Sequence, residues 1–335
     1  MFRQFRCPVA AAVLAALWLA ACGQAASPAS QASGKPATLT VNWTAVTGAN
    51  SGLWTAYEAG YFKAENLDVQ LTHIASSSRA IPAVVAGEVQ LSTADGLNLV
   101  QAVGTGADVK AVLGVTNRLV FSVMAAPKIQ TPNDLKGKKL GITKVGSSTH
   151  TAALQALHIW GLQPDRDVAF VQLSEVPNIM AALQSGQVDA GVVSPPTNSL
   201  ARKAGLKELM NVAVEGPAYA SVTIAVKGSY LAANRNVVLR FIKAYARGLH
   251  RFKTDKTFGM QAINTYLKLS DQSVLEDTWQ QFSRYLADPP YIQGLDAVIA
   301  DAALVDAQLK GAQQSRFADT SLVKQLDDSG FFKGL

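Results

Sequence analysis

The sequence predicts an α/β fold built from two lobes of similar architecture, and two observations support this prediction. Between residue 38 and about residue 227, short runs rich in β-branched residues alternate with helical stretches, which is typical of strands that alternate with helices. A local pattern also occurs twice: Gly87 and Gly186 lie 99 positions apart, and so do Val89 and Val188. A repeated unit indicates two similar lobes. The alternative is that any two α/β segments have a glycine between a helix and the next strand.

The first residues have the three parts of a secretion signal. Arg3 and Arg6 precede an apolar run over residues 9–19, and the sequence Leu-Ala-Ala leads directly to Cys22. The apolar run is too short to span a bilayer. The segment resembles a lipobox, which predicts that residues 1–21 are removed and that lipid on Cys22 holds the domain at a membrane face. The alternative is an ordinary secretory signal followed by a chance cysteine.

The predicted mature chain has 314 residues with 28 basic and 24 acidic side chains, because Arg3 and Arg6 leave with the signal. A net charge of +4 without a run of Lys or Arg argues against a nucleic-acid surface. Since Cys7 is also lost, no cysteine remains after Cys22, which excludes disulfides, thiol catalysis and cysteine-bound zinc in the folded body. Residues 22–37 lack large apolar side chains beyond the cysteine and are predicted to form a flexible tether.

The elements follow in order along the body. The predicted strands cover residues 38–43, 67–74, 109–115, 139–145 and 167–173. Beyond Lys227 the strand signals stop, and consecutive helices are predicted over residues 234–254, 257–269, 271–286 and 296–309. In the last of these, Val298, Ala302, Val305 and Leu309 are predicted to share one apolar face.

Small hydroxyl residues collect where a predicted strand leads into a helix. Such loops lie at residues 47–51 (TGANS), 76–78 (SSS), 146–149 (GSST) and 194–198 (SPPTN). In open α/β sheets, ligands bind beyond the carboxyl ends of the strands, next to helix N-termini with unpaired N–H groups. Helix capping explains each loop separately, but four loops at matching places in both halves favour a shared binding pocket.

Aromatic and charged residues near these loops extend the candidate site. Trp43 ends the first strand and Trp54 lies in the next helix, so either indole could face a small organic ligand, with core packing favoured for Trp54. Asp95 could accept a hydrogen bond from a ligand or cap a helix. Arg79 and Arg118 are the candidates for an anionic group; Arg79 could instead point to solvent, and Arg118 could pair within the hinge.

No pattern of reaction chemistry is present in the sequence. There is no phosphate-binding Gly-rich loop with Lys-Ser/Thr, no His-Glu-x-x-His and no Gly-x-Ser-x-Gly. The four histidines have no metal-ligand spacing, and only His150 is near the proposed pocket, as a surface or supporting side chain. We therefore predict a protein without catalytic residues, metal or cofactor.

Five segments carry a family resemblance. Residues 56–69 (AYEAGYFKAENLDV), 86–89 (AGEV), 134–141 (DLKGKKLG), 146–148 (GSS) and 185–190 (SGQVDA) resemble, in the same order, the periplasmic solute-binding proteins of ABC importers. The resemblance is to the NMT1/THI5-like group, which includes binders of taurine, alkanesulfonates, nitrate and thiamine-pyrimidine precursors. It covers nearly the whole body.

The resemblance implies a two-lobed periplasmic binding protein fold of type II, with a ligand cleft between the lobes. The expected domains are a signal peptide at 1–21, the lipidated tether at 22–37, the first lobe at 38–121 and 222–335, and the second lobe at 122–221. Two crossover segments near 117–126 and 218–226 would form the hinge. The implied protein is a monomeric, extracytoplasmic, lipid-anchored protein that captures a small organic anion and delivers it to an ABC permease and ATPase.

Two alternatives accompany this expectation. One is a binder of a thiamine-pyrimidine precursor or a synthase-like relative; those intracellular enzymes share a cysteine-rich iron motif, which this body lacks, and the export signal also argues against them. The other is a ligand-sensing partner without transport. The predicted ligand-binding residues are Trp43, Thr44, Asn50, Ser51, Ser76, Ser77, Ser78, Asp95, Arg118, Gly146, Ser147, Ser148, Thr149, Ser194, Pro195 and Asn198.

Overall fold

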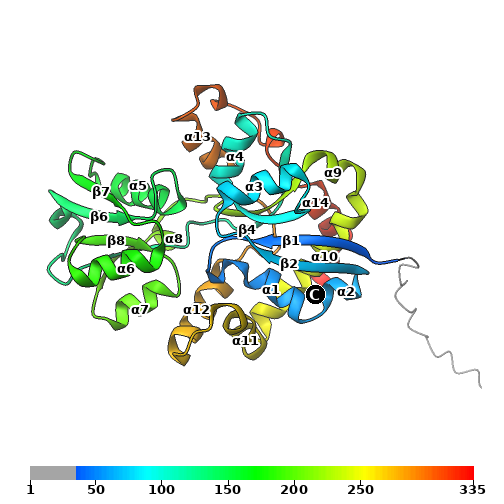
Figure 1. The fold of residues 1–335 in the computed structure, drawn as a ribbon, viewed down its shortest axis with the longest axis horizontal. Coiled ribbons are helices and arrows are strands. Elements are labelled where there is room, and N and C mark those ends of the chain that lie inside the picture. The colour runs from blue at the N-terminus through cyan, green and yellow to red at the C-terminus, as the bar shows by residue number, and fades with distance from the viewer. Residues whose placement is uncertain (1–34) are drawn as a thin grey trace, which may run out of the picture. The chain divides into compact units, whose positions relative to one another are not determined.

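The computed structural model describes residues 35–335, which form two five-stranded mixed sheets with helices around each (Figure 1). The strand orders are β2-β1-β3-β10-β4 and β7-β6-β8-β5-β9. We call the parts of the molecule built on these sheets the first lobe and the second lobe. The predicted signal peptide, the predicted lipidation site Cys22 and most of the predicted tether lie outside the described residues. No helix within residues 35–335 is long and apolar enough to cross a membrane.

The first sheet has three parallel strands, β1 to β3, followed by β10, which runs antiparallel to both β3 and β4. Its strands are β1 (Ala37–Trp43), β2 (Leu67–His73), β3 (Leu91–Asp95), β4 (Val109–Thr116) and β10 (Val222–Lys227). The helices from this part of the chain are α1 (Ser51–Glu58), α2 (Tyr61–Ala64), α3 (Ser77–Ala86) and α4 (Gly96–Gly104), with the 3-10 turn η1 (Gly48–Asn50).

The second sheet repeats this arrangement, with β6, β7 and β8 parallel and β5 antiparallel to both β8 and β9. Its strands are β5 (Ser122–Ala125), β6 (Lys138–Ile142), β7 (Val168–Gln172), β8 (Ala190–Val193) and β9 (Lys207–Asn211). Its helices are α5 (Ser148–Trp160), α6 (Val176–Ser185), α7 (Thr197–Lys203) and α8 (Val212–Glu215), with η2 (Pro132–Leu135).

The shared strand order confirms the predicted two-lobed α/β architecture. In both lobes a helix ends on a glycine in the left-handed region, Gly87 after α3 (φ 84°) and Gly186 after α6 (φ 75°). This conformation suits glycine at a helix C-terminus, which explains why the two positions match in the sequence. The chain crosses between the sheets twice, through residues 117–121 and 212–221.

The core lies on both faces of each sheet. In the first lobe, Leu39, Val41 and residues of α1 and α10 form one buried cluster, while α3, α4 and α13 cover the other face. This second cluster continues through Leu119 and Tyr219 of the crossover segments into the second lobe. The two lobes are therefore joined by packed apolar side chains as well as by the chain itself.

The helices after β10 belong to the first lobe. They are α9 (Gly228–Ala233), α10 (Arg235–Thr254), α11 (Lys256–Leu267), α12 (Gln272–Tyr285), α13 (Leu295–Ala303) and α14 (Ser321–Asp328), with the short turns η3 (Ala307–Leu309), η4 (Gln314–Arg316) and η5 (Phe331–Gly334). Helices α9, α10 and α14 contact strands of the first sheet, while α11 packs on α1, α12 on α11 and α13 on α4 (Figure 1), so a chain segment distant in sequence completes the first lobe.

One predicted helix is wrong at its C-terminal end. The helix expected over residues 296–309 stops at Ala303, and Val305, expected on the buried face, is 83 % exposed. Asp306 has an extended backbone, and its carboxylate accepts a hydrogen bond from the Gln308 N–H, which starts a separate 3-10 turn. Aspartate competes with the helical backbone in this way, so the helix ends before the apolar pattern does.

Candidate functional site

The loops at the carboxyl ends of the parallel strands approach one another across the two lobes. The Thr47 hydroxyl, in the loop after β1, donates to the Pro195 carbonyl oxygen after β8 at 3.3 Å. The Ser148 hydroxyl, at the start of α5, donates to the Asp95 carboxylate at the end of β3. The structure thus places the predicted binding residues Asp95, Ser148 and Pro195 on facing loops.

In the first loop of the first lobe, Asn50 is the organising side chain. Its amide nitrogen donates to the carbonyl oxygens of Thr44, Ala45 and Thr47 at 2.9, 3.0 and 3.3 Å, and the residue is 2 % exposed. The Thr44 N–H donates to Thr93 Oγ1 at 2.8 Å. Ser51 is buried, and its hydroxyl has no hydrogen-bond partner within residues 35–335. Asn50 therefore holds the loop in shape.

The serines after β2 divide into two roles. The buried Ser77 hydroxyl accepts the Asp95 N–H at 2.8 Å, so it fixes the backbone of the residue that contacts the second lobe. Ser76 and Ser78 lie with their hydroxyls 3.1 Å apart, Ser76 half-buried and Ser78 exposed. Asp95 Oδ1 also accepts the Asn98 N–H at 3.1 Å and caps α4.

In the loop after β6, three hydroxyl groups bind one another. Thr143 Oγ1 lies 2.8 Å from both Ser147 Oγ and Thr149 Oγ1, and the last two are 2.9 Å apart. Ser147 also caps α5 by accepting the His150 N–H at 3.4 Å. Ser148 differs from its neighbours because its hydroxyl reaches the other lobe. Of the serines and threonines in this loop, Ser148 thus makes the cross-lobe contact.

Asp95 is the carboxylate of the facing loops, and its environment disfavours negative charge. Burial raises the pKa of Asp95, while hydrogen bonds from Ser148 and from the N–H groups of Asn98 and Leu97 lower it. No Lys, Arg or His within residues 35–335 forms an ion pair with Asp95. A ligand that donates hydrogen bonds would therefore find an acceptor without a competing cation.

Of the two candidate cationic residues, Arg118 is used within the hinge and Arg79 is exposed. Arg118 Nη1 donates to the Gly216 carbonyl oxygen at 2.6 Å, which links the two crossover segments. Arg79 lies on the exposed side of α3; burial lowers the pKa of His73, and the positive charge of Arg79 lowers it further. Arg118 is therefore taken up by the crossover segments, while Lys144 is an exposed cation in the facing loop after β6.

The two tryptophans take part in an aromatic cluster of the first lobe. Trp54 is fully buried and stacks on Tyr266 with ring centroids 4.6 Å apart. Trp43 stacks on His73 at 3.8 Å and meets Trp54 edge-on at 5.3 Å. The Trp54 indole is thus committed to packing, whereas Trp43 remains half-buried.

The loop after β8 leads into α7 through a cis peptide bond between Pro195 and Pro196. Ser194 is half-buried, and its carbonyl oxygen accepts the Asn198 N–H at 3.2 Å. The Asn198 side chain is 1 % exposed and donates to Ser122 Oγ at 3.2 Å and to Gln281 Oε1 at 2.9 Å. Asn198 is therefore occupied by contacts to both lobes.

His150 supports the loop that carries Gly146. Its Nδ1 accepts the Gly146 N–H at 3.2 Å, which requires an unprotonated Nδ1. Burial lowers the pKa of His150, while the negative charge of Asp165 raises it. Because the folded protein favours the neutral ring, this contribution to stability is present above the ordinary histidine pKa and is lost as the pH falls below it.

Two valines at the facing loops were missed by sequence reasoning. Val46 is 60 % exposed and lies in the loop after β1, and Val145 is 55 % exposed and lies in the loop after β6. They lie 99 positions apart, the same interval that relates Gly87 to Gly186. This interval was the signal that could have identified them as a matched pair of exposed apolar residues in equivalent loops.

Two cavities in residues 35–335 lie away from these loops. One of about 720 Å³ is lined by α11 and α12, including Met260, Asn264, Lys268 and Leu275, and the other of about 360 Å³ lies between α3 and α9. Neither is lined by a predicted ligand-binding residue. No group of three or more His, Cys, Asp or Glu in the described part of the chain is placed to hold a metal ion.

Comparison with known families identifies relatives of this architecture. The model of the family described as NMT1/THI5 like matches residues 49–255. No curated protein sequence matches the chain significantly. The family match confirms the predicted resemblance, because it spans more than half of the chain.

Solved structures with the same fold include two sulfonate-binding proteins. The alkanesulfonate-binding protein SsuA from Xanthomonas axonopodis pv. citri, bound to MOPS, is 23 % identical with a TM-score of 0.67; the match covers 84 % of this chain and 96 % of that one. The periplasmic aliphatic sulphonate binding protein SsuA from Escherichia coli is 18 % identical with a TM-score of 0.69, over 83 % and 90 % of the chains.

A third solved structure has a different ligand. A cysteine-to-serine mutant of DszB in complex with biphenyl-2-sulfinic acid is 16 % identical with a TM-score of 0.64, over 87 % of this chain and 99 % of that one. At these identities the three likenesses concern the fold, and they confirm the two-lobed periplasmic binding protein architecture.

Proposed function

The chain belongs to the NMT1/THI5-like family, and we propose on this basis that it is the substrate-binding lipoprotein of an ABC importer. In this proposal the lobes close on a small organic anion, and the closed form delivers it to a membrane permease and its ATPase. The protein itself carries out no reaction.

The observation that carries the proposal is the approach of loops from both lobes. Ser148 of the second lobe donates to Asp95 of the first, and Thr47 of the first donates to the Pro195 carbonyl of the second. Contacts of this kind form when two lobes come together and are lost when they separate. A ligand between these loops would replace or add to such contacts and thereby stabilise the closed form.

The donors at the loops favour a ligand with a negatively charged or strongly accepting end. Helices α3, α4 and α5 begin there, and helix N-termini carry partial positive charge. Asp95 caps α4 and Ser147 caps α5, whereas no side chain caps α3. The exposed Val46 and Val145, with Trp43 behind the first loop, offer apolar contacts for the remainder of the ligand. Sulfonates and carboxylates, including aromatic ones, combine these two features.

A second candidate ligand is favoured by Asp95. A buried carboxylate without a basic partner is suited to accept hydrogen bonds from an amine or an aminopyrimidine. A binder of a thiamine-pyrimidine precursor would use it in this way. A ligand-sensing role without transport would use the same loops and differ only in the membrane partner.

A thermal-shift panel tests the ligand class. We expect the full-length protein to be stabilised by a sulfonate such as MOPS or taurine, or by benzoate, and not by sugars or peptides; nitrate and an aminopyrimidine complete the panel at fixed ionic strength. A ligand at about 100 times its dissociation constant stabilises the folded protein by about 2.7 kcal/mol. A response to sugars or peptides alone would contradict the proposed ligand class, and a response to the aminopyrimidine alone would select the second candidate.

Single substitutions locate the effect in these loops. Ser148→Ala and Ser77→Ala are expected to weaken binding of the responding compound by about 0.5–1.5 kcal/mol, or more for a charged ligand. Ser329→Ala is the matched control, because its hydroxyl donates to the Leu326 carbonyl at 2.7 Å far along the chain from the facing loops. Equal affinities for all three variants would place the ligand elsewhere.

The proposed lipid anchor is tested separately from ligand binding. Changing Cys22→Ser should move the protein from the membrane fraction to the soluble extracytoplasmic fraction, because the modified sulfur is removed. Affinity for the responding compound should stay unchanged, since the tether precedes the folded body. Mass spectrometry of the native protein that finds residues 1–21 still attached, or Cys22 without lipid, would rule out the anchor.

A further inference from the structure

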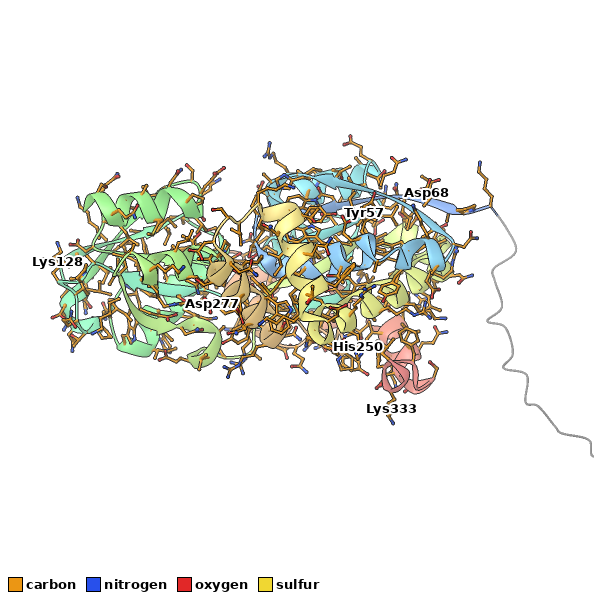
Figure 2. The ribbon with its side chains drawn as sticks, turned by 90° about the horizontal axis from the view of Figure 1, so that it is seen from below. Tyr57, Asp68, Lys128, His250, Asp277 and Lys333 are labelled. Atoms are coloured by element: carbon orange, nitrogen blue, oxygen red, sulfur yellow. The ribbon has the colours of Figure 1, made fainter. Side chains whose placement is uncertain are left out.

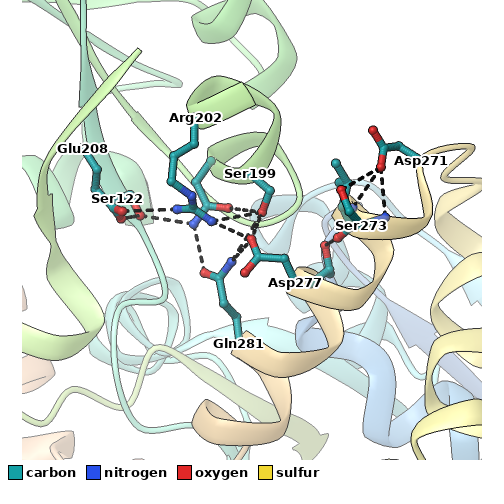
Figure 3. Close-up of polar contacts among 11 residues, drawn as sticks. Ser122, Ser199, Arg202, Glu208, Asp271, Ser273, Asp277 and Gln281 are labelled. Atoms are coloured by element: carbon teal, nitrogen blue, oxygen red, sulfur yellow. Dashed lines mark hydrogen bonds and ion pairs between the residues drawn. The ribbon is translucent and has the colours of Figure 1, made fainter. Parts of the chain in front are cut away.

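Polar side chains of α7, the helix that follows the loop after β8, bind side chains of α12 (Figure 3). Arg202 Nη2 lies 2.5 Å from Asp277 Oδ2, and Arg202 Nη1 lies 3.2 Å from Glu208 Oε2. The Ser199 hydroxyl also donates to Asp277, and Gln281 Nε2 donates to the same carboxylate at 3.0 Å. Asp277 therefore accepts from three side chains, two of them on α7.

Two further contacts join the same helices. Asn198 Nδ2 donates to Gln281 Oε1 at 2.9 Å, and Lys203 Nζ lies 2.5 Å from Asp271 Oδ2. The contacts thus extend along α7 from its first turn to its last residue. Figure 2 shows Asp277 where α12 meets the ribbon of the second lobe.

The two helices are fixed to different lobes. On α7, Ala201 is buried in an apolar cluster with Met124, Ile179 and Val193 of the second lobe. On α12, Phe282 is 1 % exposed in the core of the first lobe, and the chain just beyond it is held by a hydrogen bond of 2.9 Å from the Ala287 N–H to the Val115 carbonyl. Each helix must therefore move with its own lobe.

The contacts between the helices are polar and partly exposed, unlike the contacts that fix each helix. The side chains of Arg202 and Asp277 are 34 % and 35 % exposed, and those of Lys203 and Asp271 are 49 % and 42 % exposed. Ion pairs at such sites contribute little singly but more when they belong to a network of charges and hydrogen bonds, as here, where Arg202 pairs with both Glu208 and Asp277. Hydrogen bonds are lost when their atoms separate by about 1 Å, so a small rotation of one lobe is enough to break them.

We propose that these residues form a clasp that sets how much of the ligand-free protein is closed. The clasp consists of Asn198, Ser199, Arg202 and Lys203 on α7, of Asp277 and Gln281 on α12, and of Asp271 at the N-cap of α12. It rests on the proposed function, because only a protein whose lobes open and close needs such a device.

The position of α7 couples the clasp to the ligand. The helix begins directly after the loop with Ser194 and Pro195, and Pro195 accepts the hydroxyl of Thr47 from the first lobe. A ligand that draws this loop toward the first lobe also draws Arg202 toward Asp277. The clasp then stabilises the closed form without touching the ligand. If the clasp is too strong, the protein also closes without ligand, and closure no longer depends on ligand binding.

Hydrogen exchange of the ligand-free, full-length protein tests the clasp without knowledge of the ligand. In Asp277→Ala, the amides of residues 117–121, 145–149 and 212–221 should exchange about two- to fivefold faster than in the unchanged protein, which is the range expected from losing one such shared pair. Salt at about 1 M should accelerate exchange in the same segments of the unchanged protein and have less effect on the variant, since it screens the ion pairs.

Asp319→Ala is the matched control. Asp319 Oδ2 accepts from Arg235 Nη1 at 3.0 Å and Oδ1 accepts the Ser321 N–H at 3.0 Å, with a side-chain exposure of 29 %, but all these groups belong to the first lobe. Faster exchange should stay near residues 319–321 and the start of α10. If Asp277→Ala and Asp319→Ala, both folded by circular dichroism, exchange alike in the crossover segments, the clasp is ruled out.

Lys203→Met provides a second variant that keeps the core intact, because Lys203 and Asp271 pair at the surface. In this variant the amides of the same segments should exchange faster than in the unchanged protein, with a smaller increase than in Asp277→Ala. Unchanged exchange in both variants would overturn the clasp. The two proposals fail separately. If no compound of the expected class stabilises the protein, the ligand class is wrong but the exchange result still tests the clasp. If exchange is unchanged in the variants, the clasp is wrong but a thermal shift with a sulfonate or carboxylate still supports the ligand class.

Discussion

Replacing Trp54 by alanine is expected to lower the free energy of unfolding by about 3–5 kcal/mol, since the change removes a large buried ring and leaves a cavity. Trp54 is fully buried, stacks on Tyr266 at 4.6 Å and meets Trp43 edge-on at 5.3 Å. Tyr266 is itself held by its hydroxyl, which donates to Glu58 Oε1 at 2.8 Å. The ring therefore joins α1, α11 and the end of β1. Urea denaturation followed by circular dichroism measures the loss.

Trp54→Phe is the control for this prediction. It keeps an aromatic face against Tyr266 and removes an indole N–H that has no hydrogen-bond partner within residues 35–335. A swap between aromatic residues should cost less than about half of the alanine substitution, because a much smaller cavity is left. If Trp54→Ala kept full stability and instead abolished the thermal shift with the responding compound, the indole would belong to the ligand site and not to the core.

Much of the architecture could be predicted from the sequence because it depends on local patterns. The β-branched runs became β1, β2, β4, β6 and β7 within a few residues at each end. Gly87 and Gly186 marked equivalent helix ends, since the left-handed backbone there suits glycine in both lobes. The wrong helix end at residues 304–306 also has a local cause. The apolar spacing continues there, but the Asp306 carboxylate accepts the Gln308 N–H and starts a 3-10 turn in place of the helix.

The candidate site could be predicted only as a set of loops. Three neighbouring hydroxyls, Thr143, Ser147 and Thr149, bind one another, while Ser148 reaches Asp95 in the other lobe. Nothing in the letters SST distinguishes these roles, because they depend on the direction of each side chain from the first turn of α5. The roles of Asn50 and Asn198 were equally hidden, since their partners are fixed by the folded loops and by α12.

The clasp was outside the reach of sequence reasoning for a different reason. Asp277 and Gln281 are polar residues of an amphipathic helix, where solvent exposure is the ordinary expectation. Their partners Ser199 and Arg202 lie more than 70 positions earlier in the sequence. Only the docking of α12 onto the first lobe, which follows from buried Phe282, brings these side chains together.

Gly96→Ala is expected to cost about 3 kcal/mol of stability, near the upper end of what overpacking costs. A Cβ at this position would lie 2.0 Å from the Ala220 carbonyl oxygen, and the Gly96 N–H donates to the Ser221 carbonyl at 3.0 Å. The first turn of α4 is therefore pressed against the backbone of the second crossover segment. Backbone cannot rotate away as a flexible side chain can, so either α4 or the crossover must shift.

The same substitution should disturb the facing loops, because Gly96 directly follows Asp95. A shift of α4 would move the carboxylate away from Ser148, so exchange in residues 145–149 should rise along with the loss of stability. Gly146→Ala is the control: it also lies in a facing loop and has φ +79°, but open space surrounds its Cβ position. Its left-handed backbone should cost about 1–2 kcal/mol. The measurement is the free energy of unfolding of both variants by denaturation. If Gly96→Ala is no less stable than Gly146→Ala, α4 can move away from the crossover segment freely, and the second crossover segment does not hold Asp95 in place.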